Sequence, residues 1–475
     1  MTPNRYFNAS VVGDNVTNVY MAWLDGRAAK SNPLLEATNA LAKVTGRQPE
    51  SPDWSHDGAI LGGQDFVEEV VQNDLSANMP LMSVWLQNWP GTRLQTGAYG
   101  VSLHRLWWNW EPDMTLYPTW ARWVPHLQST YGVRTMSYIN TFLTNVSTKS
   151  TGYNTSFYEI AVSEGRFVAN AQPAMVSTID WLKKLVKKQY YSVPISGMMQ
   201  DCAYPVVSDT IDPRVFHNDY PTLWATLLRD VMTELGFQND TIAAPAPFQP
   251  NTRTCSGLVT RTLTNISDGM RAVISSTLHV GFGTHSDIGG YTNTSATVGS
   301  ITRNTALLGR WGELGAFSGT AFRTHEGNIP QMNAQAFNAR LFRSLNPYRL
   351  PLLDEYQMND WPLVRHPMVY SSNDSVARAV IAGWARLSSS VEVYMYLPLL
   401  QVDSQGTTVN STAFAYKHLW SGEEFAPGQT VRVDASWGKP GVFMRWPVTE
   451  KEGLQLQQLW EFGVAENATA LLTEA

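Results

Sequence analysis

Short apolar segments alternate with amphipathic helical segments along much of this chain, and this alternation restricts the fold more than any other feature. Apolar segments typical of strands cover residues 58–62, 81–89, 134–142 and 195–201. Each is followed by a segment with helical periodicity, at residues 65–75, 117–131, 178–189 and 220–236. Strands that alternate with helices form parallel β–α–β units, so the sequence predicts an α/β fold.

The predicted strands end in polar residues. Gln87, Asn140 and Asp201 close three of them, and a later apolar segment leads into Asp287. The active site of a (β/α)₈ barrel lies at the carboxyl ends of its strands, so these residues indicate one shared pocket. Strands that leave the sheet into solvent would also end in polar residues, and a doubly wound sheet is the alternative architecture. The pattern favours the barrel.

Helical periodicity fades after about residue 346. Residues 391–397, 414–418 and 430–433 are predicted strands, and glycine-containing turns separate them. The sequence therefore predicts three parts: an N-terminal region over residues 1–50, an α/β domain over residues 51–345, and a C-terminal antiparallel β-domain with its tail over residues 346–475.

Composition excludes several classes of protein. Apolar residues make up 43% of the 475, which suffices for a large core, whereas charged residues make up 16% with a net charge of −6. No basic block is present, so nucleic acid is not an expected partner. No segment is long and apolar enough to span a bilayer, so no membrane association is expected. The 18 tryptophans suit either sugar stacking or core packing.

The expected location rests on glycosylation sequons. Cys202 and Cys255 are too few for a disulfide framework, and residues 1–8 lack an apolar signal region. Asn-x-Ser/Thr triplets nevertheless favour a secreted glycoprotein whose true start is missing, although a Ser- and Thr-rich chain produces some by chance and a cytoplasmic location stays open. The triplets begin at Asn8, Asn15, Asn145, Asn154, Asn239, Asn265, Asn293, Asn373, Asn410 and Asn467.

Six motifs follow one another along the chain. They are Thr45–Pro49 with Trp54, Trp85–Trp89, Arg105–Trp110, Tyr138–Asn140, His285–Tyr291 and Arg323–Asn328. Their order resembles glycoside hydrolase family 31, the α-glucosidase superfamily, and most closely its sulfoquinovosidase branch. The resemblance implies a (β/α)₈ TIM barrel followed by a C-terminal antiparallel β-sandwich. The family's N-terminal β-sandwich has no room before the barrel, so it is expected to be truncated.

The resemblance also implies a retaining α-glycosidase that acts on a small-molecule glycoside without a cofactor. Retaining glycosidases need two carboxyl groups about 5–5.5 Å apart. Gly197–Asp201 resembles the family's nucleophile strand, which makes Asp201 the expected nucleophile. An aspartate that caps a turn is the structural alternative, and Cys202–Tyr204 departs from the family pattern. The histidines lack metal-ligand spacing, so no metal is expected, and a homo-oligomer is compatible with the sequence.

Further residues are assigned to the substrate by the resemblance. Arg105 and Trp108 would bind the sulfonate, and Tyr291 would bind it through water. A guanidinium and an indole N–H are both suitable donors to an oxyanion. Gln87 and His325 would bind sugar hydroxyls. The structural alternatives are core packing for Trp108 and a surface ion pair for Arg105.

The family's general acid has no counterpart in the sequence as written. The family pattern is Trp-x-Gly-Asp-Gln, but residues 243–266 contain no acidic residue. Codons that encode Leu258–Thr264 can spell Gly-Asp-Gln-Asp-Val-Asp in a shifted frame, so we hypothesise a frame error in the gene model across residues 243–266. The competing interpretations are a sugar-binding pseudoenzyme, which would keep the pocket without the acid, and a neutral α-glucosidase, against which Arg105 and Trp108 argue.

Overall fold

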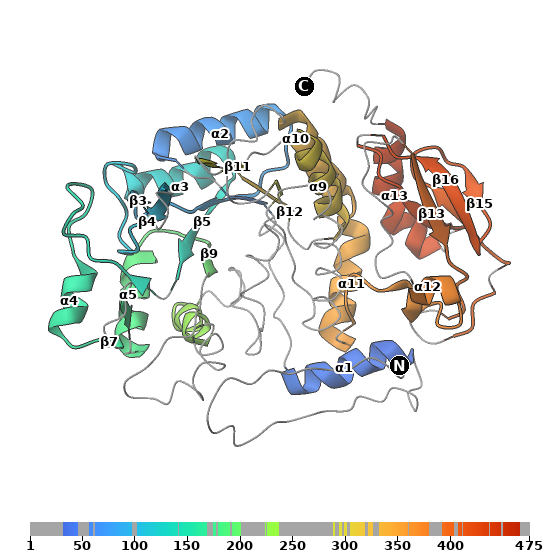
Figure 1. Cartoon of the computed structure of the whole chain (residues 1–475), viewed down its shortest axis with the longest axis horizontal. Coiled ribbons are helices and arrows are strands. Elements are labelled where there is room, and N and C mark those ends of the chain that lie inside the picture. The colour runs from blue at the N-terminus through green and yellow to red at the C-terminus, as the bar shows by residue number, and fades with distance from the viewer. Residues whose placement is uncertain are drawn as a thin grey trace.

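The structure is a computed structural model, drawn in Figure 1. It describes residues 32–45, 57–59, 62–96, 102–140, 142–168, 174–176, 179–190, 192–200, 224, 226–236, 288–289, 294–296, 299–301, 305–318, 322–325, 332–359, 361–379, 392–402, 407–410, 412–436, 438–447 and 450–465.

Parallel strands occupy the centre of the α/β part of the molecule. Strands β2 (Ser83–Leu86), β5 (Arg134–Ile139) and β9 (Gly197–Gln200) pair side by side in chain order. The first strand, β1 (Asp57–Ala59), lies beside β2 and also pairs in parallel with the late strand β12 (Phe322–His325). Sequential neighbours with the first strand against a late one are the arrangement of a (β/α)₈ barrel.

Amphipathic helices cover these strands, as Figure 1 shows. Helix α3 directs Trp120, Trp123 and Leu127 into the core and ends at Gly132, whose φ of +72° suits a residue without a Cβ. Residues 226–234 are also helical. The covering helices with printed bounds are α2 (Gln64–Ser76), α3 (Trp120–Tyr131), α5 (Ile179–Tyr190), α9 (Thr305–Ser318) and α10 (Met332–Ser344).

Smaller elements lie between the barrel strands and before them. Strands β3 (Thr92–Thr96) and β4 (Ser102–Leu106) form an antiparallel hairpin after β2. A second small sheet follows β5, made of β6 (Phe142–Leu143), β8 (Ala174–Val176) and β7 (Phe167–Val168). The other elements are α1 (Pro33–Thr45), α4 (Phe157–Ser163), β10 (Thr294–Ala296) and β11 (Gly299–Ile301).

The C-terminal part contains two small antiparallel sheets. Two short helical segments precede them, η4 (Pro367–Val369) and α12 (Ser375–Ala379). Strands β13 (Glu392–Leu397) and β16 (Gln429–Asp434) form one pair. Buried and exposed residues alternate along the second half of β16, which is typical of a sheet with one solvated face. Strands β15 (Glu424–Phe425), β14 (Ala415–His418) and β17 (Phe443–Trp446) form a second sheet. Helix α13 (Glu450–Ala465) follows.

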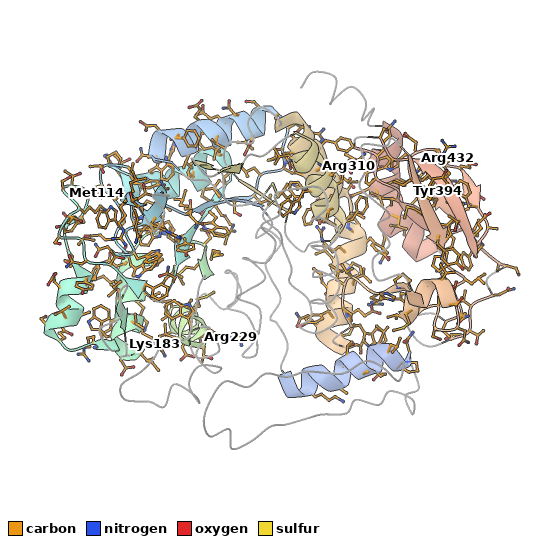
Figure 2. The ribbon with its side chains drawn as sticks, in the orientation of Figure 1. Met114, Lys183, Arg229, Arg310, Tyr394 and Arg432 are labelled. Atoms are coloured by element: carbon orange, nitrogen blue, oxygen red, sulfur yellow. The ribbon has the colours of Figure 1, made fainter. Side chains whose placement is uncertain are left out.

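The two parts share a hydrophobic core. Leu419, Met444 and Leu459 of the C-terminal part belong to the same buried cluster as Trp311 and Phe337 of the barrel helices. A polar contact reinforces it. Arg310 on α9, labelled in Figure 2, donates to the carbonyl of Ala435 at 2.7 Å, and Glu313 accepts from the backbone N–H of Gly438 at 2.8 Å.

The expectation that helices fade after residue 346 is wrong in detail. Helix α11 (Asn346–Asn359) begins at that residue, and α13 forms a further helix at residues 450–465. Pro351 lies inside α11, and buried Arg349 interrupts its apolar positions, so the sequence carries little helical periodicity there. The domain boundary near residue 346 stays a prediction.

No helix in the described ranges is long and apolar enough to cross a membrane.

Asp74 on α2 is a buried carboxyl group, with 8% of its surface exposed. Burial raises its pKa from the usual 3.8 to about 7. The folded protein therefore holds this proton more tightly than the unfolded chain does. As a result, the free energy of unfolding should fall as the pH rises from about 4 to about 7.

Asp74→Asn removes this charge and is expected to raise the free energy of unfolding at about pH 8 by up to roughly 4 kcal/mol, with little change at about pH 4. Urea unfolding at the two pH values measures the difference. Asp65→Asn, at an exposed position of the same helix, is the matched control. An equal gain at both pH values would contradict the assignment to ionisation of Asp74.

Candidate active site

The carboxyl ends of β2, β5 and β9 meet at one edge of the parallel sheet. Gln87 directly follows β2 and is half-buried, and Asn140 directly follows β5 and is buried. β9 ends at Gln200, one residue before Asp201. Asp201 itself lies outside the described residues. The structure thus brings the predicted strand ends of Gln87 and Asn140 to the same edge as the strand that leads into Asp201.

Asn140 serves the local turn. Its Oδ1 accepts from the backbone N–H of Phe142 at 2.9 Å, and its Nδ2 donates to the hydroxyl of Tyr138 at 3.4 Å. An asparagine that accepts from the backbone two residues on stabilises an Asx-turn. The strand-end polarity at Asn140 is therefore accounted for by the turn.

The β3–β4 hairpin and the segment that follows it are attached to this edge. The N–H of Trp107 donates to the carbonyl of Gly91 at 3.0 Å, just beyond the turn after β2. The N–H of Thr144 donates to the carbonyl of Trp108 at 3.2 Å. The ring of Trp108 lies 5.3 Å from that of Phe142, which follows β5. Trp108 consequently sits beside the carboxyl ends of β2 and β5, where a barrel places its active site.

Arg105 and Trp108 both present donors that lack a partner in the described part of the chain. The Arg105 side chain is exposed on β4, and no carboxylate within the described ranges pairs with it. Trp108 is half-buried, and its Nε1 is shielded from solvent without an acceptor among the described residues. A buried N–H without an acceptor is costly. The core residue Trp120 likewise has an Nε1 without an acceptor in the described ranges, so a binding role for Trp108 is favoured by this donor only together with its half-buried position beside the strand ends. The structural alternative for Arg105, a surface ion pair, is not formed within these ranges.

The backbone around Trp108 is strained. Trp108 and Trp110 have φ values of +32° and +50°, a region that residues with a Cβ rarely adopt. Trp110 is held there by its Nε1, which donates to the carbonyl of Phe142 at 2.8 Å. Such strain is concentrated at binding and catalytic sites, where the surrounding structure enforces a particular side-chain direction.

Most other tryptophans of this region are core residues. Trp89 is fully buried, with ring centroids 6.4 Å from Trp110 and 5.8 Å from Trp120. Its Nε1 donates to the carbonyl of Tyr138 at 2.9 Å. Among the described tryptophans before residue 125, Trp108 is the one that is not fully buried. Core packing thus accounts for these tryptophans, and sugar stacking is not needed to explain them.

A buried ion pair fixes the loops that carry the site. Lys149 lies 2.9 Å from Asp113, and both side chains are almost inaccessible. Lys149 also donates to the carbonyl of Pro90 at 3.0 Å, and the N–H of Asp113 donates to the carbonyl of Trp89 at 2.8 Å. Burial by itself would raise the pKa of Asp113, but hydrogen bonds from Thr115 and Lys149 outweigh it and hold that pKa below its usual range.

Glycine is required beside this pair. Gly91 and Gly152 have φ values of +84° and +83°, and a Cβ at either would lie 2.2 Å from a carboxylate oxygen of Asp113. The close approach of these two loops to the carboxylate therefore depends on the absence of a side chain.

Asp113→Ala would leave Lys149 charged, buried and unpaired, and is expected to lower the free energy of unfolding by about 3–5 kcal/mol. Denaturant unfolding measures it. Glu164→Ala, which breaks the exposed pair with Arg166, is the control and should cost no more than about 1 kcal/mol. Similar losses from both variants would show that the buried pair does not fix these loops.

The remaining predicted substrate residues are placed only in part. His325 is the last residue of β12, which is parallel to β1, so its backbone lies at the carboxyl end of a barrel strand. Tyr291 and the anomalous segment at 243–266 lie outside the described residues. Within the described ranges, no group of three His, Cys, Asp or Glu side chains could hold a metal ion.

Sequence reasoning overlooked Arg93. It stands directly opposite Arg105 in the β3–β4 hairpin, and its guanidinium carbon lies 5.2 Å from the ring centre of Trp107. The sequence around Arg93 gives little indication of a hairpin. Two short polar segments flank residues 97–101, and they lack the apolar alternation by which strands are recognised.

A protein-family model matches most of the α/β part of the chain. The model of the glycosyl hydrolases family 31 TIM-barrel domain matches residues 54–354. The chain is 28% identical over 456 residues to the sulfoquinovosidase of Agrobacterium fabrum, covering 86% of this chain and 65% of that protein. It is 27% identical over 448 residues to the sulfoquinovosidase of Escherichia coli, covering 87% of this chain and 63% of that protein. The chain thus spans slightly less than two thirds of the length of these relatives.

Solved structures show the same fold. A family 31 sulfoquinovosidase from E. rectale, in complex with an aza-sugar inhibitor, superposes with a TM-score of 0.71 at 24% identity, covering 91% of this chain and 68% of that chain. An α-xylosidase of the same family from a soil metagenome superposes with a TM-score of 0.66 at 16% identity, covering 90% of this chain and 67% of that chain.

Proposed function

The chain belongs to glycosyl hydrolase family 31, and on that premise we propose that it hydrolyses α-glycosides of sulfoquinovose. Specificity for a sulfonated sugar is supported by the two hydrogen-bond donors beside the strand ends. Arg105 has no carboxylate partner in the described ranges, and the Trp108 N–H is buried without an acceptor there. Similarity to two sulfoquinovosidases supports the same substrate class.

A sulfonate could accept hydrogen bonds from both the Arg105 guanidinium and the Trp108 indole N–H. It carries a full negative charge and several acceptor oxygens, so it can accept from a guanidinium and from an indole N–H at once. A neutral glucoside offers only a hydroxyl at that position, which leaves the charge of Arg105 without a counterion. The pair therefore favours the sulfonated sugar over glucose, with Tyr291 as a further donor through water and with Gln87 and His325 as partners for ring hydroxyls.

We assign the nucleophile to Asp201. Its carboxylate would attack the anomeric carbon as the glycosidic bond breaks, and water would then release the sugar from the covalent intermediate with net retention. The support is its position one residue after β9, at the edge where Gln87 and Asn140 also emerge. A second carboxyl group must protonate the leaving oxygen and then take the proton of the attacking water. Residues 243–266 supply no such group in the sequence as written.

The alternative is a non-catalytic sugar-binding protein. It rests on one specific observation, the absence of an acidic residue across residues 243–266. Such a protein would keep Arg105 and Trp108 and bind sulfoquinovose without cleaving it.

The deciding experiment compares hydrolysis of 4-nitrophenyl α-sulfoquinovoside with that of the matching α-glucoside. 4-Nitrophenolate is a stable leaving group that needs little protonation, so this substrate reports on the chain even without a general acid. Preference for the sulfonated substrate supports the proposal. Binding of sulfoquinovose without cleavage would favour the binding protein, and preference for the glucoside would refute the roles of Arg105 and Trp108.

A further inference from the structure

The β3–β4 hairpin places two arginines directly opposite each other. Arg93 on β3 pairs in register with Arg105 on β4. Side chains of directly opposed residues leave an antiparallel pair on the same face, with Cβ atoms about 4.5–5.5 Å apart. Two like charges in this position repel each other and destabilise a hairpin. A negative charge bound between the two guanidinium groups would relieve this repulsion.

The described part of the chain does not supply that charge. Neither β3 nor β4 contains an acidic residue, and no carboxylate within the described ranges pairs with Arg93 or Arg105. The Nε of Arg93 is shielded from solvent and has no acceptor among the described residues. Burial also lowers the pKa of Arg93, which reflects loss of water around the guanidinium without compensation by an anion.

A cation–π contact fixes the Arg93 guanidinium. Its Cζ lies 5.2 Å from the ring centre of Trp107, which is buried and lies two residues beyond Arg105. The backbone N–H of Trp107 donates in turn to the carbonyl of Gly91. Contact with the face of an aromatic ring uses none of the N–H donors of a guanidinium, so they stay available to a ligand.

We propose that Arg93 and Arg105 form a paired anion site, so that Arg93 is a second specificity-determining residue for the anionic group of the substrate. The inference rests on the proposed function for the identity of that group, a sulfonate on a sugar. The pair would bind it between two guanidinium groups on one face of the hairpin, with the Trp108 N–H close by in sequence. Binding the anion also removes the repulsion within the hairpin.

The test measures binding to the full chain by calorimetry, with sodium methanesulfonate, sulfoquinovose and glucose as probes. Arg93→Met keeps an apolar contact with Trp107 but removes the charge, and Arg93→Lys keeps the charge but loses the planar donors. Arg105→Met is the comparison. Arg122→Met, at an exposed position on α3, is the matched control, and sodium chloride controls for ionic strength.

Arg93→Met and Arg105→Met are each expected to weaken binding of methanesulfonate and sulfoquinovose by about 10- to 100-fold, with glucose binding unchanged. The double variant should lose less than the product of the two, because both residues act on one anion. Arg93→Lys should fall between Arg93→Met and the unaltered chain. Without ligand, Arg93→Met should melt at a higher temperature than the unaltered chain, since repulsion is relieved, whereas a purely packing role would lower that temperature.

The outcomes separate this inference from the proposed function. If Arg93→Met and Arg105→Met both lose methanesulfonate binding, the paired anion site is supported. If the unaltered chain then shows no preference for sulfoquinovose over glucose, the proposed substrate is refuted while the anion site stands. Unaltered anion binding by Arg93→Met, beside impaired binding by Arg105→Met, would overturn the role of Arg93. Failure of the unaltered chain to bind either anion would overturn the paired site.

Discussion

Asp201→Asn is expected to lower turnover of 4-nitrophenyl α-sulfoquinovoside on the order of 10⁴- to 10⁶-fold, because an amide cannot form the glycosyl ester. The loss should appear in kcat, with little change in the affinity for sulfoquinovose, since Arg105 and Trp108 would still hold the sulfonate. Asp65→Asn, an exposed carboxyl of α2, is the control for general effects of removing a carboxylate. Steady-state kinetics with calorimetric binding measures both quantities.

A second variant distinguishes a nucleophile from a carboxylate that only supports the turn. Asp201→Ala leaves space on the face from which the carboxylate attacks, so added azide should restore cleavage and give a glycosyl azide of the β configuration. Mass spectrometry and proton NMR identify that product. An Asp201→Asn enzyme with nearly full turnover, or the absence of any azide adduct from a folded Asp201→Ala protein, would assign Asp201 to the turn.

The second large effect concerns the absent acid. A chain whose residues 243–266 are rebuilt in the shifted frame, to contain Gly-Asp-Gln-Asp-Val-Asp, is expected to hydrolyse methyl α-sulfoquinovoside about 10²- to 10⁴-fold faster than the chain as written. The gain in kcat/KM should be smaller for the 4-nitrophenyl substrate, because its leaving group departs without a proton. The gain in kcat should remain, because the same carboxyl deprotonates the water that releases the sugar. Initial rates with the two substrates measure this difference.

The control for the rebuilt chain carries Gly-Asn-Gln in place of Gly-Asp-Gln, which preserves the length and polarity of the segment. It should retain the affinity for sulfoquinovose and lose the gain with the methyl substrate. Equal gains in both rebuilt chains would mean that the segment acts on folding and supplies no proton. Sequencing of the coding DNA gives an independent result, because the shifted frame must spell the motif.

Much of the barrel was predictable because its elements have strong periodic signals. The strand expected at residues 134–142 is β5, and the helices expected at residues 65–75 and 178–189 are α2 and α5. Each of these segments is buried along its whole length or along one stripe, so the spacing of its apolar residues shows where the element lies in the sequence. The predicted C-terminal strands at 391–397 and 430–433 are β13 and β16 for the same reason.

The geometry of the site was less accessible to sequence reasoning. Strand β3 has mostly exposed residues, so it lacks the apolar alternation that predicts strands. The opposition of Arg93 and Arg105 depends on a register that only the backbone reveals. The same holds for Trp108, because neither its positive φ nor the isolation of its Nε1 is encoded in a local pattern. The roles of Gln87, Arg105, Trp108, Tyr291, His325 and Asp201 stay predictions.

The core that barrel helices share with the C-terminal part affects how this protein can be divided. A gene fragment that stops at residue 345 would lose Leu419, Met444 and Leu459 and would expose the face of α9 and α10 that they cover. The buried carboxylate of Glu313 would lose its contact with the Gly438 N–H at the same time. Neither part is therefore fully packed along this face without the other. In evolutionary terms, recombination near residue 346 would have to exchange both sides of the interface together.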